Sequence, residues 1–300
     1  MESGSKPSLP IILILLLIAV SGPLGLCVLQ QQELRPMELK VLCFNIRNGH
    51  GKDGDNRWEL RKGLVTEVIA ANHADVIGVQ EAYHFQLEFL LEELPAYRSV
   101  GVGRDGGTRG EHCPILYRAD RFELIDSGTF WLSDTPEVPS THWGNRYRRI
   151  CTWAHLSERK TQRSFWVYNT HFDHESEAAR RHSARLIMET IAGRSSDSPF
   201  VFCGDFNSYE DSDVTAYLKG KATIERDNPI PLIDTWRVIH PDNPDCGTVS
   251  RFTGSMERSK IDSIFTTPDQ KVLNARIIRF NRDGRYPSDH YPVDALLRLR

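Results

Sequence analysis

Residues 199–207 read Pro-Phe-Val-Phe-Cys-Gly-Asp-Phe-Asn, a short apolar run that ends abruptly in polar residues. An apolar run of this length, rich in aromatic and β-branched residues, is typical of a buried β-strand. Gly204 and Asp205 then indicate a turn at the point where the strand ends. Side chains at such a position are held by rigid backbone and left accessible by the loop that follows. The stretch therefore predicts a strand that delivers Asp205 and Asn207 to one edge of a sheet.

The same pattern recurs along the chain, with polar clusters directly after or before apolar runs. The other clusters are residues 43–47, 79–81, 169–174, 260–265 and 286–290. Taken singly, an Asn or Asp after a strand is most often a turn former that binds its own backbone. Their joint occurrence instead favours a shared site at one sheet edge. Oxygen donors without cysteine are typical of a hard cation such as Mg²⁺ or Mn²⁺.

The periodicity of the remaining chain predicts a mixture of strands and helices. Predicted strands cover residues 40–45, 76–80, 115–118, 150–155, 164–170, 199–203, 263–266 and 272–280, and predicted helices cover 58–72, 85–94 and 175–191. Strand and helix do not alternate strictly, as they would in a doubly wound parallel sheet. The pattern therefore favours layered sheets with helices outside.

The composition is that of an ordinary globular protein. Of 300 residues, 40% are hydrophobic and 26% are charged, which excludes disordered and fibrous classes and allows a full-size core. Lys and Arg number 37 against 40 Asp and Glu, for a net charge of −3. A protein that coats nucleic acid needs a basic surface, so this balance argues against stable coating. It does not exclude an enzyme that binds a single phosphate.

Residues 1–36 are expected to form a targeting segment and a short linker. Residues 11–20 are an unbroken apolar run with the length of a signal-peptide core, and Ala19-Val20-Ser21 offers small residues for cleavage before Gly22. We expect export to the periplasm or to the outside of the cell. The alternative is an uncleaved anchor over residues 11–29, although Gly and Pro interrupt that stretch. Contact with the membrane would then be confined to this segment.

Five cysteines follow this segment: Cys43, Cys113, Cys151, Cys203 and Cys246. An odd number argues against a scaffold built on disulfides. Cys43 and Cys203 lie in apolar runs, where a free thiol usually packs as a small hydrophobic group. Cys113 and Cys151 each open a strand-like run, so the two could meet across a sheet and form a disulfide. No Cys or His pair has zinc spacing, which argues against a zinc site.

The order of the polar clusters resembles the endonuclease/exonuclease/phosphatase superfamily, which includes deoxyribonuclease I, repair exonucleases, neutral sphingomyelinases, inositol polyphosphate phosphatases and deadenylases. The motifs that carry the resemblance are Asn45, Gln80-Glu81, Asn169-Thr170-His171, Gly204-Asp205-Phe206-Asn207, Ile261-Asp262 and Ser288-Asp289-His290. The likeness covers residues 37–300, the expected catalytic domain, and is nearest to an exported bacterial branch. It implies an α/β fold, a four-layered sandwich of two packed mixed β-sheets flanked by helices, with the site at one edge.

The resemblance implies a divalent metal site. Glu81 looks like the main ligand, with Asn45 beside it and Asp289 as a further direct or water-mediated ligand. Mg²⁺ is the expected cation, with Mn²⁺ or Ca²⁺ as alternatives. Arg47 stands two residues after Asn45, where repair endonucleases carry an acidic ligand. This departure favours a one-metal site and argues against repair of abasic DNA.

The resemblance also implies roles in catalysis. His290 is either the general base or an imidazole that contacts the phosphate, and Asp262 would orient it. Asp205 would hold the attacking water and Asn207 would bind a phosphate oxygen. His171 resembles the residue that stabilises the charge of the transition state or assists the leaving oxygen. The sequence leaves open which of Asp205 and His290 is the base.

Substrate binding is expected on the Arg149 side of the site. Arg149 matches an arginine that clamps phosphate in the nuclease branch. Residues 139–190 carry nine Lys and Arg against five Asp and Glu, so positive charge surrounds Arg149 and His171 and would attract a phosphate. Residues 129–149, with several Trp and Pro, are expected to form a long loop that selects the substrate.

The expected function is metal-dependent hydrolysis of phosphate esters by an activated water. The substrate is anionic, so a cation and hydrogen-bond donors must neutralise its oxygens as charge shifts. A phosphodiesterase acting on nucleic acid or a phospholipid headgroup is the first interpretation, and a phosphomonoesterase acting on a sugar or inositol phosphate is the alternative. A non-catalytic binding protein on the same fold is a third, disfavoured because every motif position holds a competent residue. We expect a monomer whose partner is its phosphate-ester substrate.

Overall fold

The computed structural model describes residues 36–256 and 260–300, in which twelve strands pair into two six-stranded sheets. The strands are β1 (Met37–Asn45), β2 (Val76–Gln80), β3 (Tyr97–Val100), β4 (Ile115–Arg118), β5 (Phe122–Trp131), β6 (Ile150–Glu158), β7 (Ser164–His171), β8 (Phe200–Asp205), β9 (Ile233–Asp234), β10 (Asp262–Thr266), β11 (Lys271–Ile277) and β12 (Val293–Leu299). The sheet orders are β11-β12-β1-β2-β4-β3 and β5-β6-β7-β8-β10-β9.

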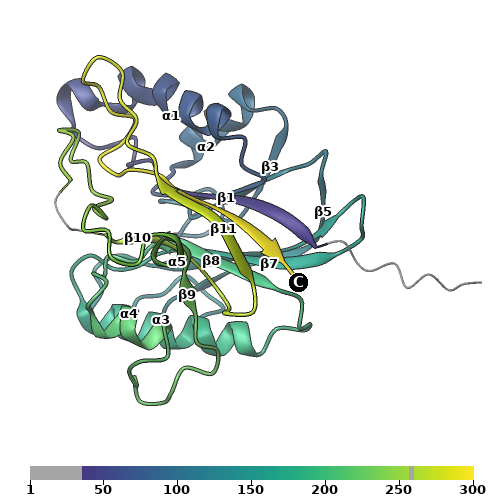
Figure 1. Ribbon diagram of the computed structural model, residues 1–300. Helices are drawn as coiled ribbons and strands as arrows, with labels where there is room; N and C mark the ends of the chain where they lie inside the picture. Colours follow the sequence, from purple (N-terminus) through teal and green to yellow (C-terminus); the bar gives the residue numbers. More distant parts are fainter. Residues whose placement is uncertain (1–35, 257–259) are drawn as a thin grey trace, which may run out of the picture. The chain divides into compact units, whose positions relative to one another are not determined.

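Helices cover the outer face of each sheet. They are α1 (Trp58–Asn72), α2 (His84–Glu93), α3 (Glu177–Ala192), α4 (Asp213–Leu218) and α5 (Thr235–Ile239), with a 3₁₀ turn η1 (Gly54–Asn56). Figure 1 shows α1 and α2 on one side of the paired sheets and α3 and α4 on the other. Apolar side chains of α1 and α2 pack against β1 and β2, and those of α3 and α4 pack against β7 and β8. The layers confirm the predicted four-layered α/β sandwich of two mixed sheets.

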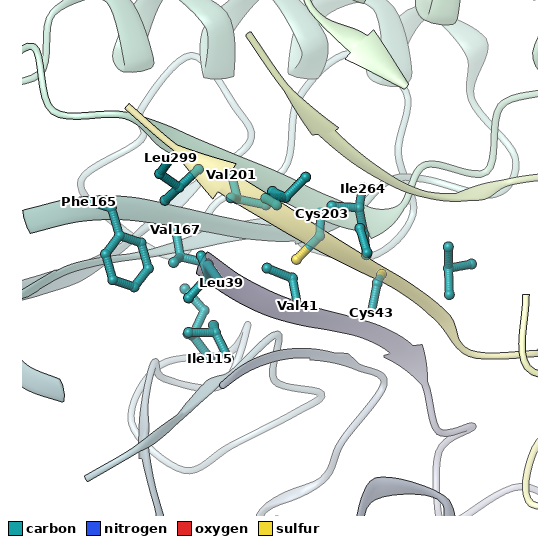
Figure 2. Close-up of a cluster of buried hydrophobic side chains, with 14 of the residues drawn as sticks. Leu39, Val41, Cys43, Ile115, Phe165, Val167, Val201, Cys203, Ile264 and Leu299 are labelled. Atoms are coloured by element: carbon teal, nitrogen blue, oxygen red, sulfur yellow. The ribbon is translucent and has the colours of Figure 1, made fainter. Parts of the chain in front are cut away.

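The central core lies between the two sheets and holds them together. β1 contributes Leu39, Val41 and Cys43, which face Val167 and Val201 of the second sheet (Figure 2). All five side chains are fully buried. Burying a side chain of this size contributes about 1.5–3 kcal/mol, so this layer fixes how the sheets, and the residues at their edges, are aligned.

Strand register brings the polar clusters to one edge of the sandwich. β1 and β2 are parallel and align Asn45 with Gln80, while β7 and β8 are parallel and align His171 with Asp205. β10 runs antiparallel to β8 and places Asp262, its first residue, opposite Asp205. The carboxyl ends of four strands and the amino end of β10 therefore meet at the same edge.

Most predicted elements are confirmed, and three of the omissions have physical reasons. β5 is absent from the predicted strands because it lies at a sheet edge, where only two of its ten residues are buried and the apolar signal is weak. α4 and α5 have six and five residues, too few to show helical periodicity. The sequence also does not predict β3, β9 and β12.

The Cys113–Cys151 disulfide that the sequence leaves open is not formed, because all five cysteines after the targeting segment are free and buried. Cys113 packs with Ile150 on one face of β6, whereas Cys151 packs beneath α3 on the other face. Successive residues of a strand point to opposite faces, so the two thiols are kept apart. The predicted targeting segment lies outside the described residues. Within residues 36–256 and 260–300, no helix is long and apolar enough to cross a membrane.

Candidate active site

A polar cavity of about 420 Å³ opens at the edge where the strands end. The predicted site residues that line it are Glu81, Arg149, His171, Asp205, Asn207, Asp289 and His290. Asn45 and Asp262 are almost fully buried and contact these residues from behind. The structure therefore brings all nine predicted site residues together.

Three residues that follow strands have an unusual backbone conformation. Arg47, Glu81 and Asn207 have φ values of 57°, 62° and 45°, in the left-handed region. Residues other than glycine adopt this region at a cost in conformational energy, and such backbone strain concentrates at functional sites. Here the conformation turns the chain sharply after β1, β2 and β8, in the loops that carry the functional side chains.

Asn45 links the two halves of the site. Its Nδ2 donates to Glu81 Oε1 at 3.0 Å and to Asp205 Oδ2 at 2.9 Å, while its Oδ1 accepts from the Arg47 N–H. Glu81 Oε2 also accepts from the Asn48 N–H at 2.9 Å. Burial raises the pKa of Glu81, but the hydrogen bonds from Asn45 and the Asn48 N–H, together with the positive charge of His290, hold the net pKa well below the usual range. Glu81 is therefore an ionised carboxylate at neutral pH.

His290 and Asp262 form a buried pair next to Asp205. His290 Nδ1 lies 2.9 Å from Asp262 Oδ2 and 3.8 Å from Asp205 Oδ2. Burial, together with the charge of Asp262, raises the pKa of Asp205 to about 7. Burial opposes protonation of His290, but Asp262 and Asp205 outweigh it and raise the pKa of the imidazole well above its usual value. At neutral pH this pair therefore places a cationic imidazole beside a carboxyl that titrates near 7.

His171 differs in charge from His290 although both lie against Asp205. Its Nε2 is 3.5 Å from Asp205 Oδ2. Burial, with the positive charge of Arg149, holds its pKa well below the usual value. His171 is therefore a neutral imidazole, suited to hydrogen bonding rather than to charge neutralisation.

Two groups of side chains fit a divalent cation. Asp205, Asp262 and His290 present ligand atoms within 4.8 Å of one another, a buried cluster consistent with a metal site. Asp262 Oδ1 is also buried with no hydrogen-bond partner among the described residues. The second group is the predicted one, Glu81 with Asn45 and Asp289. Both offer oxygen donors and no sulfur, as hard cations prefer.

The predicted phosphate ligands are held by their own partners. Arg149, 5% exposed, places Nε 3.4 Å from Asp173 Oδ2 and Nη2 2.8 Å from His174 Nδ1. Asn207 donates from Nδ2 to the Phe172 carbonyl at 3.0 Å. Both still line the cavity, so each is pre-positioned at its wall rather than free to move.

Several lining residues are not marked by the sequence, chiefly Arg104 and Glu111 from residues 101–113, and Tyr83 and Tyr147. Five glycines punctuate residues 101–113, so no apolar periodicity marks them. Residues 132–149 have no regular secondary structure, as predicted for the loop over residues 129–149, whereas residues 129–131 belong to β5. The loop reaches the cavity wall through Tyr147 and Arg149, and its role in substrate selection stays a prediction. The glycine-rich loop adds Arg104 and Glu111 to the same wall.

Comparison with known proteins agrees with this arrangement. Residues 42–290 match the profile of the Endonuclease/Exonuclease/phosphatase family, which confirms the resemblance carried by the motifs. A solved Bacteroides vulgatus protein of that family is 34% identical, with a TM-score of 0.79, and the match covers 88% of this chain and all of the other. A Bacteroides thetaiotaomicron mannosyl-6-phosphatase is 33% identical, with a TM-score of 0.75 over 86% of this chain and 99% of its own.

Curated relatives extend beyond bacteria. Drosophila melanogaster nocturnin is 27% identical over 309 aligned residues, which cover 85% of this chain. The match spans only 46% of the length of nocturnin. The similarity to nocturnin is therefore confined to the shared domain, and more than half of the nocturnin chain has no counterpart in this sequence.

Proposed function

The chain belongs to the endonuclease/exonuclease/phosphatase family, and from that premise we propose that it is a Mg²⁺-dependent phosphomonoesterase acting on a sugar phosphate. The observation that carries the proposal is the composition of the cavity. The cavity walls carry the residues expected to bind phosphate and also the ion pair of Glu111 and Arg104, which belongs to none of the motifs. A cavity of about 420 Å³ is in the range of small-molecule sites. The 33% identity to a mannosyl-6-phosphatase supports the same substrate class.

Two residues carry the proposed chemistry. Asp205, with a pKa near 7, accepts the proton of the attacking water, because a base that titrates near the working pH combines a populated basic form with adequate strength. His290, held by Asp262 at 2.9 Å, donates to the phosphoryl oxygens as an imidazolium. Asp205 is therefore the proposed base and His290 the cationic donor, although the sequence alone allows either residue to be the base.

The other cavity residues position the phosphate. His171, neutral, donates a hydrogen bond to the leaving oxygen, and Asn207 and Arg149 supply donors for nonbridging oxygens. Arg149 and Asn207 are fixed by partners behind them, so little reorganisation is needed as charge develops. Such fixed donors are a main source of rate acceleration in reactions of anionic substrates.

We propose that Glu81 is the principal metal ligand, assisted by Asp289. Glu81 is ionised and lines the cavity, whereas Asp262 Oδ2 is engaged by His290 and Asp205 Oδ2 by Asn45. Mg²⁺ bound there would supply Lewis-acid polarisation of a phosphoryl oxygen. Arg47, which contacts Asp289 at 3.7 Å, adds positive charge on the same side.

Substrate turnover tests the proposed function. With Mg²⁺, kcat/KM for mannose 6-phosphate and p-nitrophenyl phosphate is expected to exceed that for bis-p-nitrophenyl phosphate by about 100-fold, or about 2.7 kcal/mol. Plasmid DNA and sphingomyelin should be poor substrates. A chelator should abolish turnover and added Mg²⁺ should restore it. A preference for the diester would return the assignment to the phosphodiesterase that the sequence puts first.

We also propose that residues 1–36 direct export, on the basis of the apolar run at 11–20. Amino-terminal sequencing of the protein isolated from its producing cells is expected to give a start at Gly22. A start at Met1 or Glu2 would instead support the uncleaved anchor over residues 11–29.

A further inference from the structure

A second polar cluster lines the cavity beside the catalytic residues. It consists of Arg104, Glu111 and Tyr147, none of which belongs to a recognised motif. Arg104 Nη1 donates to Glu111 Oε2 at 2.7 Å, and the Arg104 guanidinium lies 4.9 Å from the centre of the Tyr147 ring. We call these three side chains the Glu111 cluster. Nothing in the proposed phosphate chemistry uses them.

The Glu111 cluster is held rigidly at the same sheet edge as the catalytic residues. The His112 N–H donates to the Ala82 carbonyl at 2.7 Å, directly after Glu81, and the Arg104 N–H donates to the Glu111 carbonyl at 2.9 Å. Trp131 Nε1 donates to the Arg104 carbonyl at 2.7 Å. The loop over residues 101–113 is thereby fastened to the end of β2 and to β5. Fixed side chains of this kind are typical of a binding site.

The cluster combines three kinds of contact. The side chains of Arg104 and Glu111 are only 12% and 14% exposed, and no described residue donates to Glu111 Oε1. A carboxylate oxygen therefore remains as an acceptor, since an ionised carboxylate can accept about four hydrogen bonds. Arg104 has further N–H donors, and Tyr147, 38% exposed, presents an aromatic ring that also stacks with His174. An acceptor, a donor and an aromatic face together are complementary to a ring that carries adjacent hydroxyl groups.

The charge of the cluster depends on pH. Burial, with the charge of Glu81, raises the pKa of Glu111 to about 7, although Arg104 opposes the shift. The carboxylate is therefore ionised above neutral pH and gains a proton below it. Its capacity to accept hydrogen bonds from hydroxyl groups is greatest on the alkaline side.

The position of the cluster suits the leaving group of the ester. Glu111 and Arg104 line the same cavity as Arg149 and His171. A phosphate held by Arg149 and His171 would direct its ester oxygen and the attached group toward the cluster.

We propose that the Glu111 cluster is a leaving-group subsite that binds vicinal hydroxyl groups of a monosaccharide monophosphate. Glu111 accepts from two hydroxyls, Arg104 donates to an adjacent oxygen, and Tyr147 packs against the C–H face of the ring. The proposal rests on the proposed function and refines its substrate class.

The test, at about pH 8 where Glu111 is ionised, compares a sugar phosphate with an ester whose leaving group has no vicinal hydroxyls. In Glu111→Gln, the ratio of kcat/KM for mannose 6-phosphate to that for p-nitrophenyl phosphate is expected to fall about tenfold to a hundredfold, as expected for losing hydrogen bonds to a charged group. Tyr147→Leu, at an exposed position that tolerates truncation, should lower the same ratio through a higher KM. Glu137→Gln, an exposed carboxylate outside the cavity lining, should leave the ratio unchanged.

Each outcome separates the subsite from the proposed function. Equal losses on both monoesters in Glu111→Gln and Tyr147→Leu would mean a structural role and would overturn the subsite. If the wild type hydrolyses only diesters, the proposed function fails, and inhibition of bis-p-nitrophenyl phosphate hydrolysis by methyl mannoside then tests the cluster alone. Inhibition that is present in the wild type and lost in Glu111→Gln supports the subsite. Absence of inhibition in the wild type overturns it.

Discussion

Replacing Asp205 by asparagine is expected to lower kcat by about 10³-fold, within the range for removal of a general base. Asn keeps the size of the side chain, and its carbonyl oxygen can still accept from either Asn45 or the Asn207 N–H, but it cannot accept the proton of the attacking water. Burial and Asp262 raise the pKa of Asp205 to about 7, so wild-type activity should increase with pH as this carboxyl ionises. A cation bound nearby favours the charged form, so this acidic limb should move to lower pH at saturating Mg²⁺.

The control for this prediction is a matched Asp→Asn change outside the cavity. Asp211 is exposed and lies in the loop that follows β8, so Asp211→Asn should retain wild-type kcat and the same pH profile. Thermal unfolding of both variants checks that the fold is intact. If Asp205→Asn keeps more than about a tenth of the wild-type kcat, the base lies elsewhere. His290 is then the candidate, and His290→Gln should show the larger loss.

The parts of the fold and site that the sequence predicts share one property, which is that each is encoded locally. An apolar run predicts a strand, and the polar residues at its end predict where that strand stops. Parallel pairing of β7 with β8 then places His171 next to Asp205. The position of Asp262 does not follow from this local rule, because Asp262 begins a strand and contacts His290, which lies 28 residues away in the sequence. The family resemblance supplies that link.

Features that depend on loop conformation could not be predicted. Glu111 lies in a glycine-rich loop without periodicity, and its place at the cavity wall depends on the bond from the His112 N–H to the Ala82 carbonyl. The role of Asn45 as a bridge between Glu81 and Asp205 depends on a contact 160 residues along the chain. Arg149 is correctly predicted at the wall, but its partner Asp173 comes from a different loop. Side-chain partners of this kind follow from packing between loops, which no sequence period encodes.

Replacing Glu81 by glutamine is expected to weaken Mg²⁺ or Mn²⁺ binding by at least about 100-fold, or about 2.7 kcal/mol. Glu81 is an ionised carboxylate of the cavity, and its loss removes a full negative charge while preserving the shape of the side chain. The bound cation stabilises the charge of the transition state by several kcal/mol, so its loss should lower kcat at low Mg²⁺ by about 10³-fold. High Mg²⁺ refills the weakened site and should restore part of the activity. Calorimetric titration with Mn²⁺ measures the binding directly and does not depend on activity.

A parallel titration of Asp262→Asn decides between the two candidate metal groups. Asp262 belongs to the buried cluster with Asp205 and His290, but its Oδ2 is already engaged by the imidazole at 2.9 Å. If the cation binds at Glu81, Asp262→Asn should bind Mn²⁺ within about threefold of the wild type while losing activity, because His290 loses the group that orients and charges it. The exposed Glu92→Gln on α2 serves as the charge-matched control and should change neither property. The reverse pattern, with binding lost in Asp262→Asn and kept in Glu81→Gln, would place the cation in the buried cluster and leave Glu81 to orient Asn45 and the loop after β2.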